Sequence, residues 1–218
     1  MPQLRRLIPT TFAAALTCAA LAPAAADAQL VAVNPQSSVL VVGDSLAVGL
    51  RPYLQRQLGT DVAWDAKSGR TTPQGLLALR AALKIVQPTT VVVSLGTNDG
   101  SSPVRFQDRI DRMLSAIGSK RCVVWTNIYR PARKGPYAPL NSVLSAEASR
   151  VTRLHLVDWL SAVSSRAVTL PDGLHPNTEG FEYRSQLIAD AVKDDCGVGT
   201  IGSETAQSDA TGGVASPA

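Results

Sequence analysis

Short apolar runs rich in β-branched residues alternate with amphipathic segments from residue 38 to residue 192. Five of these runs are apolar at nearly every position, which is typical of strands buried on both faces of a parallel sheet. They are Ser38–Gly43, Asp61–Ala66, Thr90–Leu95, Arg121–Asn127 and Leu154–Trp159. Five other segments place apolar residues three and four positions apart, which predicts helices. They are Leu46–Leu58, Pro73–Val86, Val104–Ile117, Leu140–Arg150 and Thr178–Val192.

This regular alternation of strand and helix predicts an α/β protein. We expect a five-stranded, doubly wound parallel sheet with right-handed crossovers and helices on both faces, a three-layer α/β/α sandwich. Gly59, Pro88 and Gly118 lie just beyond three of the predicted helices, where such residues end helices. Ligands of such sheets bind beyond the C-terminal ends of the strands, so functional residues are expected in the loops at that edge.

The length and composition of the chain favour one compact domain. A chain of 218 residues with 45% hydrophobic content can bury a sizeable core. We expect this domain over residues 29–196. The remaining residues 197–218 are rich in Gly, Ser, Thr and Ala and have no apolar periodicity, which predicts a disordered tail.

Residues 1–28 are predicted to be a secretory signal peptide. Arg5 and Arg6 precede an apolar, alanine-rich run from Phe12 to Leu21, and Ala26-Asp27-Ala28 fits a small-x-small cleavage site. The run is shorter than the roughly 20 residues that a membrane span needs. We therefore expect cleavage before Gln29, no stable membrane insertion, and a mature protein that is secreted or periplasmic.

Two variants of this prediction leave the export route open. Cys18 fits a lipoprotein site poorly, because Thr17 before it is larger than such sites prefer. The arginine pair fits a twin-arginine signal as well as an ordinary positive start.

Several classes of partner and cofactor find no support in the sequence. The net charge is only +4, and no Lys/Arg run is interleaved with aromatic residues, so we expect no nucleic-acid partner. Two histidines, without a His-Glu-x-x-His motif or paired cysteine ligands, favour no metal site. The sequence has no Gly-x-x-x-x-Gly-Lys-Ser/Thr phosphate loop either. We expect no cofactor.

Removal of residues 1–28 would leave two cysteines, Cys122 and Cys196. Cys122 opens a predicted strand and Cys196 follows the last predicted helix, and helix ends and strand starts share one edge of a parallel sheet. In an oxidising compartment we therefore expect a disulfide between them. A loop of this length gives it a stabilising effect of about 4 kcal/mol. The alternative is two unconnected cysteines.

Four short segments carry the candidate chemistry. The first three directly follow predicted strands, and the fourth lies in the loop before the last predicted helix, so all four are expected at one edge of the sheet. They are Gly43-Asp44-Ser45-Leu46, Ser68-Gly69-Arg70, Gly96-Thr97-Asn98-Asp99 and Asp172-Gly173-Leu174-His175-Pro176.

Together these segments contain the groups needed for acyl transfer through a serine. The Ser45 hydroxyl needs a base, and His175, oriented by Asp172 three residues earlier, is the better placed of the two histidines. The Ser45 and Gly69 amides and the Asn98 side chain are candidate oxyanion donors. Singly, each residue also fits a helix cap or an ordinary turn. Their order and their positions at strand ends favour catalysis.

Residues outside the four central positions have weaker candidate roles. Arg70 follows Gly69, where it would contact substrate or belong to the start of the next helix. Tyr129 follows a strand end and is a second candidate for substrate binding, as part of an aromatic wall. His155 lies inside a predicted strand and is expected to be a packed or edge histidine.

The four segments resemble those of the SGNH hydrolases, also called the GDSL family, over about residues 38–191. The resemblance implies a flavodoxin-like α/β/α sandwich. It also implies a nucleophile at Ser45, oxyanion donors at Ser45, Gly69 and Asn98, and an Asp172/His175 pair. An α/β-hydrolase is not indicated, since Ala47 replaces the last glycine of Gly-x-Ser-x-Gly.

We expect a monomeric, exported, cofactor-independent serine esterase that hydrolyses a small-molecule or envelope O-acyl ester. Two alternatives stay open at this point. One is an O-acyltransferase or deacetylase acting on cell-envelope carbohydrate, because water and sugar hydroxyls attack the same acyl-enzyme. The other is a secreted binding module without activity.

Overall fold

A computed structural model of the protein describes residues 29–32 and 34–198. Its centre is one sheet with the strand order β1-β3-β2-β4-β5-β6, in which the last five strands of this order are parallel. The strands are β1 (Gln29–Ala32), β2 (Val39–Gly43), β3 (Val62–Lys67), β4 (Thr90–Ser94), β5 (Cys122–Thr126) and β6 (Leu154–Val157). The predicted five-stranded parallel sheet is confirmed. The predicted signal peptide and all but the first two residues of the predicted tail lie outside the described residues.

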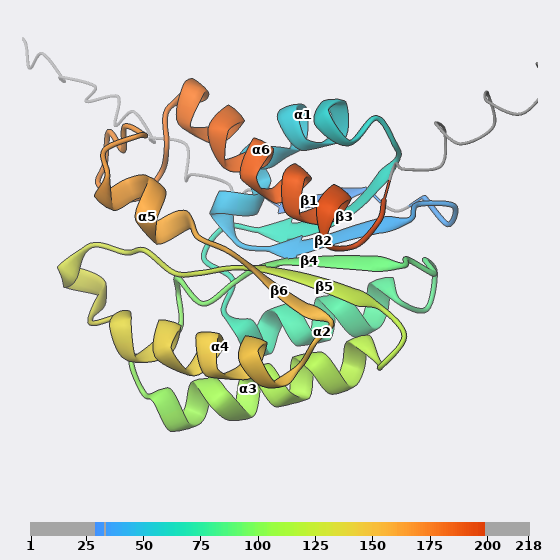
Figure 1. Cartoon of the computed structure of the whole chain (residues 1–218), viewed down its shortest axis with the longest axis horizontal. Helices are drawn as coiled ribbons and strands as arrows, with labels where there is room; N and C mark the ends of the chain where they lie inside the picture. The colour runs from blue at the N-terminus through green and yellow to red at the C-terminus, as the bar shows by residue number, and fades with distance from the viewer. Residues whose placement is uncertain (1–28, 33, 199–218) are drawn as a thin grey trace, which may run out of the picture.

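Helices cover both faces of the sheet, as predicted (Figure 1). Helices α1 and α6 pack on one face, and α2, α3 and α4 pack on the other. The helices are α1 (Ser45–Leu58), α2 (Thr72–Ala82), α3 (Pro103–Ile117), α4 (Ala138–Arg150), α5 (Trp159–Ser164) and α6 (Thr178–Asp194), with a 3₁₀ turn η1 (Ala132–Lys134). None of the helices within residues 29–32 and 34–198 is long and apolar enough to span a bilayer.

The sheet has a sixth strand that the hydrophobic pattern did not predict. Strand β1 runs antiparallel to β3 at the sheet edge, with Gln29 opposite Lys67 and Ala32 opposite Trp64. Four residues are too few to show a period, and they directly follow the predicted cleavage site. Cleavage before Gln29 would leave this strand whole.

Two predicted elements end two or more residues earlier in the structure. The strand predicted over Leu154–Trp159 ends at Val157, because the Asp158 carboxylate accepts a hydrogen bond from the Ser161 amide and begins α5. Trp159 is therefore helical. The helix predicted over Pro73–Val86 ends at Ala82, beyond which turn-type hydrogen bonds replace the helical ladder.

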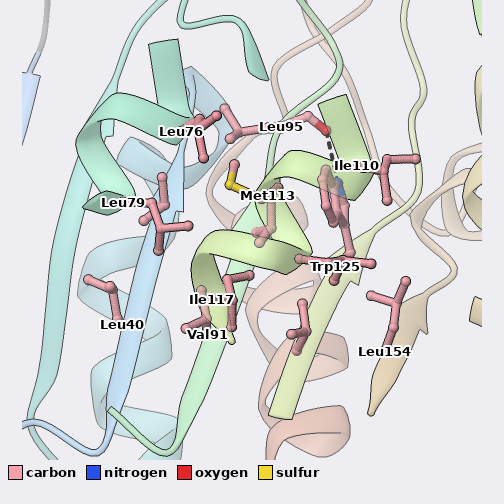
Figure 2. Close-up of a cluster of buried hydrophobic side chains, with 14 of the residues drawn as sticks. Leu40, Leu76, Leu79, Val91, Leu95, Ile110, Met113, Ile117, Trp125 and Leu154 are labelled. Carbon is pink, nitrogen blue, oxygen red and sulfur yellow. Dashed lines mark hydrogen bonds between the residues drawn. The ribbon is translucent and has the colours of Figure 1, made fainter. Parts of the chain in front are cut away.

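The core consists of two apolar layers, one on each face of the sheet. The layer under α2, α3 and α4 contains Trp125, whose indole N–H donates to the Leu95 carbonyl at 3.2 Å (Figure 2). Phe106 packs edge-on against this indole at 6.4 Å between ring centroids. Trp125 thus fills the core, and its one polar group is satisfied.

The predicted disulfide is present. Cys122 at the start of β5 is bonded to Cys196 just after α6, at a Cα–Cα distance of 5.7 Å. His155 on β6 lies beside this bridge, half-buried, with Nδ1 3.7 Å from a carboxylate oxygen of Asp195. The bridge and His155 lie at the edge of the sheet where the strands begin, opposite the loops that follow the strands.

Candidate active site

Ser45 lies where β2 ends and α1 begins, at the C-terminal edge of the central strands. Asp44 caps the helix, since its Oδ1 accepts a hydrogen bond from the Leu46 amide at 3.0 Å. Ser45 is the first residue of α1, so its amide points out of the positive end of the helix. The local sequence therefore places a hydroxyl and an amide donor side by side.

Ser45, His175 and Asp172 form a continuous hydrogen-bonded chain. His175 Nε2 lies 2.8 Å from Ser45 Oγ, and His175 Nδ1 lies 2.6 Å from Asp172 Oδ2. Ser45 and His175 are separated by 130 positions in the sequence, and the loop before α6 brings them together. The side chains of His175 and Asp172 are 39% and 54% exposed, so the site is open to solvent.

The Asp172 carboxylate is held in its charged form. The hydrogen bond from the His175 ring, followed by that from the His175 amide, lowers the pKa of Asp172 well below its ordinary value. Oδ1 accepts from the amides of His175 at 2.7 Å and Leu174 at 2.9 Å. An acceptor fixed in this way keeps the proton of the imidazole on Nδ1 and leaves Nε2 as the base toward Ser45.

Two backbone amides and one side chain converge beside Ser45. Gly69 has φ +73°, a conformation that favours glycine, in the turn that follows β3. Within the described part of the chain, the amides of Ser45 and Gly69 donate to no protein acceptor. Asn98 Nδ2 donates to the Arg70 carbonyl at 3.2 Å and to Asp44 Oδ2 at 3.4 Å. These groups can donate to an oxygen that becomes negative next to Ser45.

Two buried charged residues, Asp44 and Arg184, lie beneath the nucleophile, and sequence reasoning missed their electrostatic interaction. Asp44 is completely buried, and burial raises its pKa to about 6, although the Leu46 amide and the positive charge of Arg184 act in the opposite direction. Arg184 on α6 is 1% exposed and donates to Thr126 at 2.9 Å and Ser94 at 3.2 Å. Burial lowers its pKa to about 10, so it stays charged at neutral pH.

Arg184 also stacks on an aromatic ring. Its guanidinium lies 4.5 Å above the buried ring of Trp159, the first residue of α5. A sequence signal existed, because Arg184 occupies the apolar stripe of α6 together with Ile188 and Val192, where a charge is unexpected. The sequence pattern placed Trp159 only at the end of a predicted strand.

Arg70 and Tyr129, the two candidates for substrate binding, make intramolecular contacts. The Arg70 guanidinium is buried, contacts the Asp65 carbonyl, and forms an ion pair with the Asp65 carboxylate at 2.6 Å. Its carbonyl, by contrast, accepts from Asn98. The half-buried ring of Tyr129 packs on Tyr137 at 5.7 Å between centroids.

Asp99 connects the loop that carries Gly69 to the loop that carries Asn98. Its Oδ1 accepts from the Thr72 amide at the start of α2 at 2.9 Å and pairs with Arg109 at 3.2 Å. The loop that carries Gly69 is thereby fixed to the loop that carries Asn98. Rigid loops hold donors in place before a substrate arrives.

One group of potential metal ligands occurs in the described part of the chain. It consists of Cys122, His155 and Cys196. Both sulfurs are joined in the disulfide, so neither offers the thiolate that a metal binds. The group also lies at the strand-start edge of the sheet, away from Ser45.

A family model described as the GDSL-like lipase/acylhydrolase family matches residues 41–183, from β2 into α6. The chain belongs to this family. The family predicted from the four motifs is confirmed, and so is the enzyme class, a hydrolase that acts on ester bonds.

Relatives and solved structures agree with this membership. The chain is 30% identical over 171 residues to the thioesterase 1/protease 1/lysophospholipase L1 of Escherichia coli K12, covering 70% of this chain and 81% of the relative. A lipase/acylhydrolase from Enterococcus faecalis superposes with a TM-score of 0.63 at 23% identity, covering 72% of this chain and 96% of that one.

The catalytic domain of a Streptococcus pneumoniae peptidoglycan O-acetyltransferase shares the same fold. It superposes with a TM-score of 0.61 at 20% identity, over 74% of this chain and 96% of that one. Proteins named as hydrolases and one named as an O-acetyltransferase therefore share this fold.

Proposed function

We propose that this GDSL-family protein is an exported serine esterase that hydrolyses O-acyl esters through an acyl-enzyme on Ser45. The observation that carries the proposal is the unbroken chain from Ser45 Oγ through His175 to the Asp172 carboxylate, with contacts of 2.8 and 2.6 Å. A serine with a hydrogen-bonded base, and a base with a hydrogen-bonded carboxylate, is the arrangement that activates a hydroxyl.

In the first half of the reaction, His175 Nε2 accepts the hydroxyl proton while Ser45 Oγ attacks the ester carbonyl carbon. The negative oxygen of the tetrahedral intermediate accepts from the Ser45 and Gly69 amides and from Asn98 Nδ2. The C–O bond to the alcohol then breaks, and His175 returns the proton to the departing alcohol oxygen. Asp172 stabilises the imidazolium between these two proton transfers.

In the second half, a water molecule takes the place of the alcohol. His175 accepts a proton from water as the water oxygen attacks the acyl carbon, and the same three donors hold the oxyanion. Ser45 Oγ leaves with the proton, and the carboxylic acid is released. The free enzyme is regenerated, and the net reaction converts one ester and one water into an alcohol and a carboxylic acid.

Short acyl groups suit this site better than fatty chains. The hollow beside Gly69 is lined largely by polar side chains, among them Asp65, Lys67 and Gln74. A long alkyl chain needs an apolar pocket to offset its exposure to water. We therefore expect acetyl and similar esters to be the preferred substrates.

Export is part of the proposal and rests on the sequence of residues 1–28 together with the Cys122–Cys196 disulfide. Disulfides persist in oxidising compartments such as the periplasm and the cell exterior. N-terminal sequencing of the protein recovered from the periplasm and culture medium tests it. A mature N-terminus at Gln29 supports export, and a full-length protein found only in the cytoplasm contradicts it.

Turnover of p-nitrophenyl esters of increasing acyl length, measured on the mature chain from Gln29, tests the esterase. We expect the highest kcat/KM at short acyl lengths and loss of turnover in Ser45→Ala. Ser149→Ala, which removes an exposed hydroxyl from α4, is the matched control and should keep full activity. Absence of turnover by folded protein at every length would contradict the esterase.

An O-acyltransferase is the second candidate, favoured by the exposure of His175 and Asp172. An open site admits a carbohydrate hydroxyl to the acyl-enzyme as readily as water. Mixing the enzyme with p-nitrophenyl acetate and an oligosaccharide acceptor separates the two functions. Acetylated sugar in excess of free acetate indicates a transferase, and acetate alone indicates an esterase.

A further inference from the structure

A buried arginine anchors the loop between β5 and α4 to the loop that carries Asn98. Arg130 is 1% exposed, and its guanidinium donates to the carbonyls of Gly135 at 3.0 Å and Pro136 at 2.8 Å within its own loop. The same group donates to the Ser101 hydroxyl at 3.0 Å and to the Asp99 carbonyl across the gap. A desolvated guanidinium with this many acceptors fixes the two loops relative to each other.

Gly135 makes the close approach of these loops possible. Its φ is +83°, and a Cβ at this position would lie 2.6 Å from the Ser101 hydroxyl. A side chain here would therefore be strained and would push the loops apart. The loop around residue 134 is built to sit against residues 96–101.

This anchored loop presents Lys134 to Asn98. Lys134 Nζ donates to Asn98 Oδ1 at 2.9 Å, while Asn98 Nδ2 faces Arg70 and Asp44. Within the described residues, Lys134 has no carboxylate at ion-pair distance. Its neighbour Arg133 is also exposed but makes no hydrogen bond in that part of the chain.

We propose that Lys134 is a positioning residue of the oxyanion hole, which holds the Asn98 amide with its N–H groups toward the reacting carbonyl. The inference rests on the proposed function, because it assigns a task to the same oxyanion donors. The Oδ1 and Nδ2 ends of an asparagine amide are similar in size, so the amide fits either way round. An ammonium next to Oδ1 allows only the orientation in which Nδ2 is the donor. The positive charge also draws electrons toward Oδ1 and strengthens the N–H donors.

Loss of the Lys134 ammonium should weaken stabilisation of the transition state. It should change neither the stability of the fold nor the binding of the substrate in its ground state. Lys134 is exposed and Asn98 is half-buried, and a contact to an exposed ammonium contributes little to folding. Asn98 Nδ2 makes only long contacts of 3.2 and 3.4 Å, which a developing oxyanion can replace. Removal of the ammonium should therefore lower kcat and leave KM and the unfolding midpoint unchanged.

Lys134→Met, measured beside Arg133→Met, tests the proposal. Both variants remove one exposed cation from the same turn η1, so they match in net charge. We expect kcat for p-nitrophenyl acetate to fall about tenfold in Lys134→Met, less than the loss of a whole donor, and to stay unchanged in Arg133→Met. Lys134→Arg should recover most of the loss. Equal activity of the two Met variants would overturn the proposal.

A double-mutant cycle with Asn98→Ala tests whether Lys134 acts through Asn98. The Lys134→Met change should cost nothing further in the Asn98→Ala background, because there is no amide left to orient. The same tenfold loss in both backgrounds would mean that Lys134 acts directly on substrate, and would overturn the positioning role.

Labelling of Ser45 by diethyl p-nitrophenyl phosphate separates this proposal from the proposed function. Ser45 Oγ attacks phosphorus as His175 Nε2 accepts its proton, p-nitrophenolate leaves, and the phosphoryl oxygen occupies the oxyanion hole, so no carboxylic ester is needed. Mass spectrometry should find labelling about tenfold slower in Lys134→Met. Equal rates would overturn only the Lys134 proposal. A folded wild-type protein that is not labelled would contradict the Ser45 nucleophile, and the Lys134 proposal would fall with it.

Discussion

The Asp172 carboxylate accepts hydrogen bonds from both the ring and the backbone of His175. Oδ2 lies 2.6 Å from Nδ1, and Oδ1 lies 2.7 Å from the amide nitrogen. One side chain therefore fixes the tautomer of the imidazole and also the loop that carries it. This double contact explains how an exposed loop before α6 can hold a histidine within 2.8 Å of Ser45.

Asp172→Asn should lower kcat by about 10² to 10⁴ and change KM little. An asparagine can offer its N–H₂ group to Nδ1, which places the imidazole proton on Nε2 and removes the base facing Ser45. Steady-state kinetics with p-nitrophenyl acetate measure the effect. Retention of wild-type kcat in a folded variant would contradict the role of Asp172.

The buried carboxyl of Asp44 predicts a pH dependence of stability. Its pKa rises from 3.8 to about 6 on folding, so between these values the folded state binds more protons than the unfolded state. The free energy of unfolding contributed by Asp44 therefore falls as pH rises through this window. Relative to Asp44→Asn, the wild type should lose on the order of 3 kcal/mol. Urea unfolding at several pH values measures it, and parallel curves for the two proteins would contradict it.

Arg184→Met should destabilise the protein by about 3 kcal/mol at pH 8, because it leaves the Asp44 carboxylate buried without its compensating charge. The same change in an Asp44→Asn background should cost less, with a coupling energy of about 1 kcal/mol or more. The hydrogen bonds of Arg184 to Ser94 and Thr126 are lost in both backgrounds and cancel. Additive effects would show that Arg184 stabilises the fold through Ser94, Thr126 and Trp159 and not through Asp44.

Replacing Cys122 and Cys196 by serine should lower the free energy of unfolding by about 4 kcal/mol, since the bridge closes a long loop. The two cysteines are 74 positions apart. The bridge lies at the strand-start edge of the sheet, so kcat of the folded variant should not change. Urea unfolding and ester hydrolysis on the same sample check both expectations. A loss of kcat in the folded protein would contradict the separation of the bridge from the site.

Local sequence patterns predict much of this architecture. The five parallel strands are nearly continuous apolar runs, and Ser45, Gly69, Asn98 and the Asp172/His175 pair belong to short motifs next to strand or helix ends. Topology then brings the motifs to one edge, as the 2.8 Å contact across 130 positions illustrates. Strand β1 was missed because four residues carry no period.

The supporting residues could not be predicted in the same way, because their partners are distant in the sequence. Lys134 and Asn98 are 36 positions apart, and no motif contains Lys134. Arg184 reaches Ser94 across 90 positions. Arg70 is a residue that the sequence singled out, because its place after Gly69 suggested substrate binding. In the structure its guanidinium pairs with Asp65. Such contacts depend on side-chain directions that only the folded chain defines.

Trapping the acyl-enzyme tests whether Ser45 is the nucleophile. The mature protein is mixed with p-nitrophenyl acetate, quenched in acid within the first turnover, digested, and analysed by mass spectrometry, with Ser45→Ala and His175→Ala treated in parallel. We predict one acetyl group on the peptide that contains Ser45 in the wild type and none on that peptide in either variant. Turnover of the ester without acetylation of Ser45, or an acetyl group on a different residue that forms and decays at the rate of turnover, would contradict it.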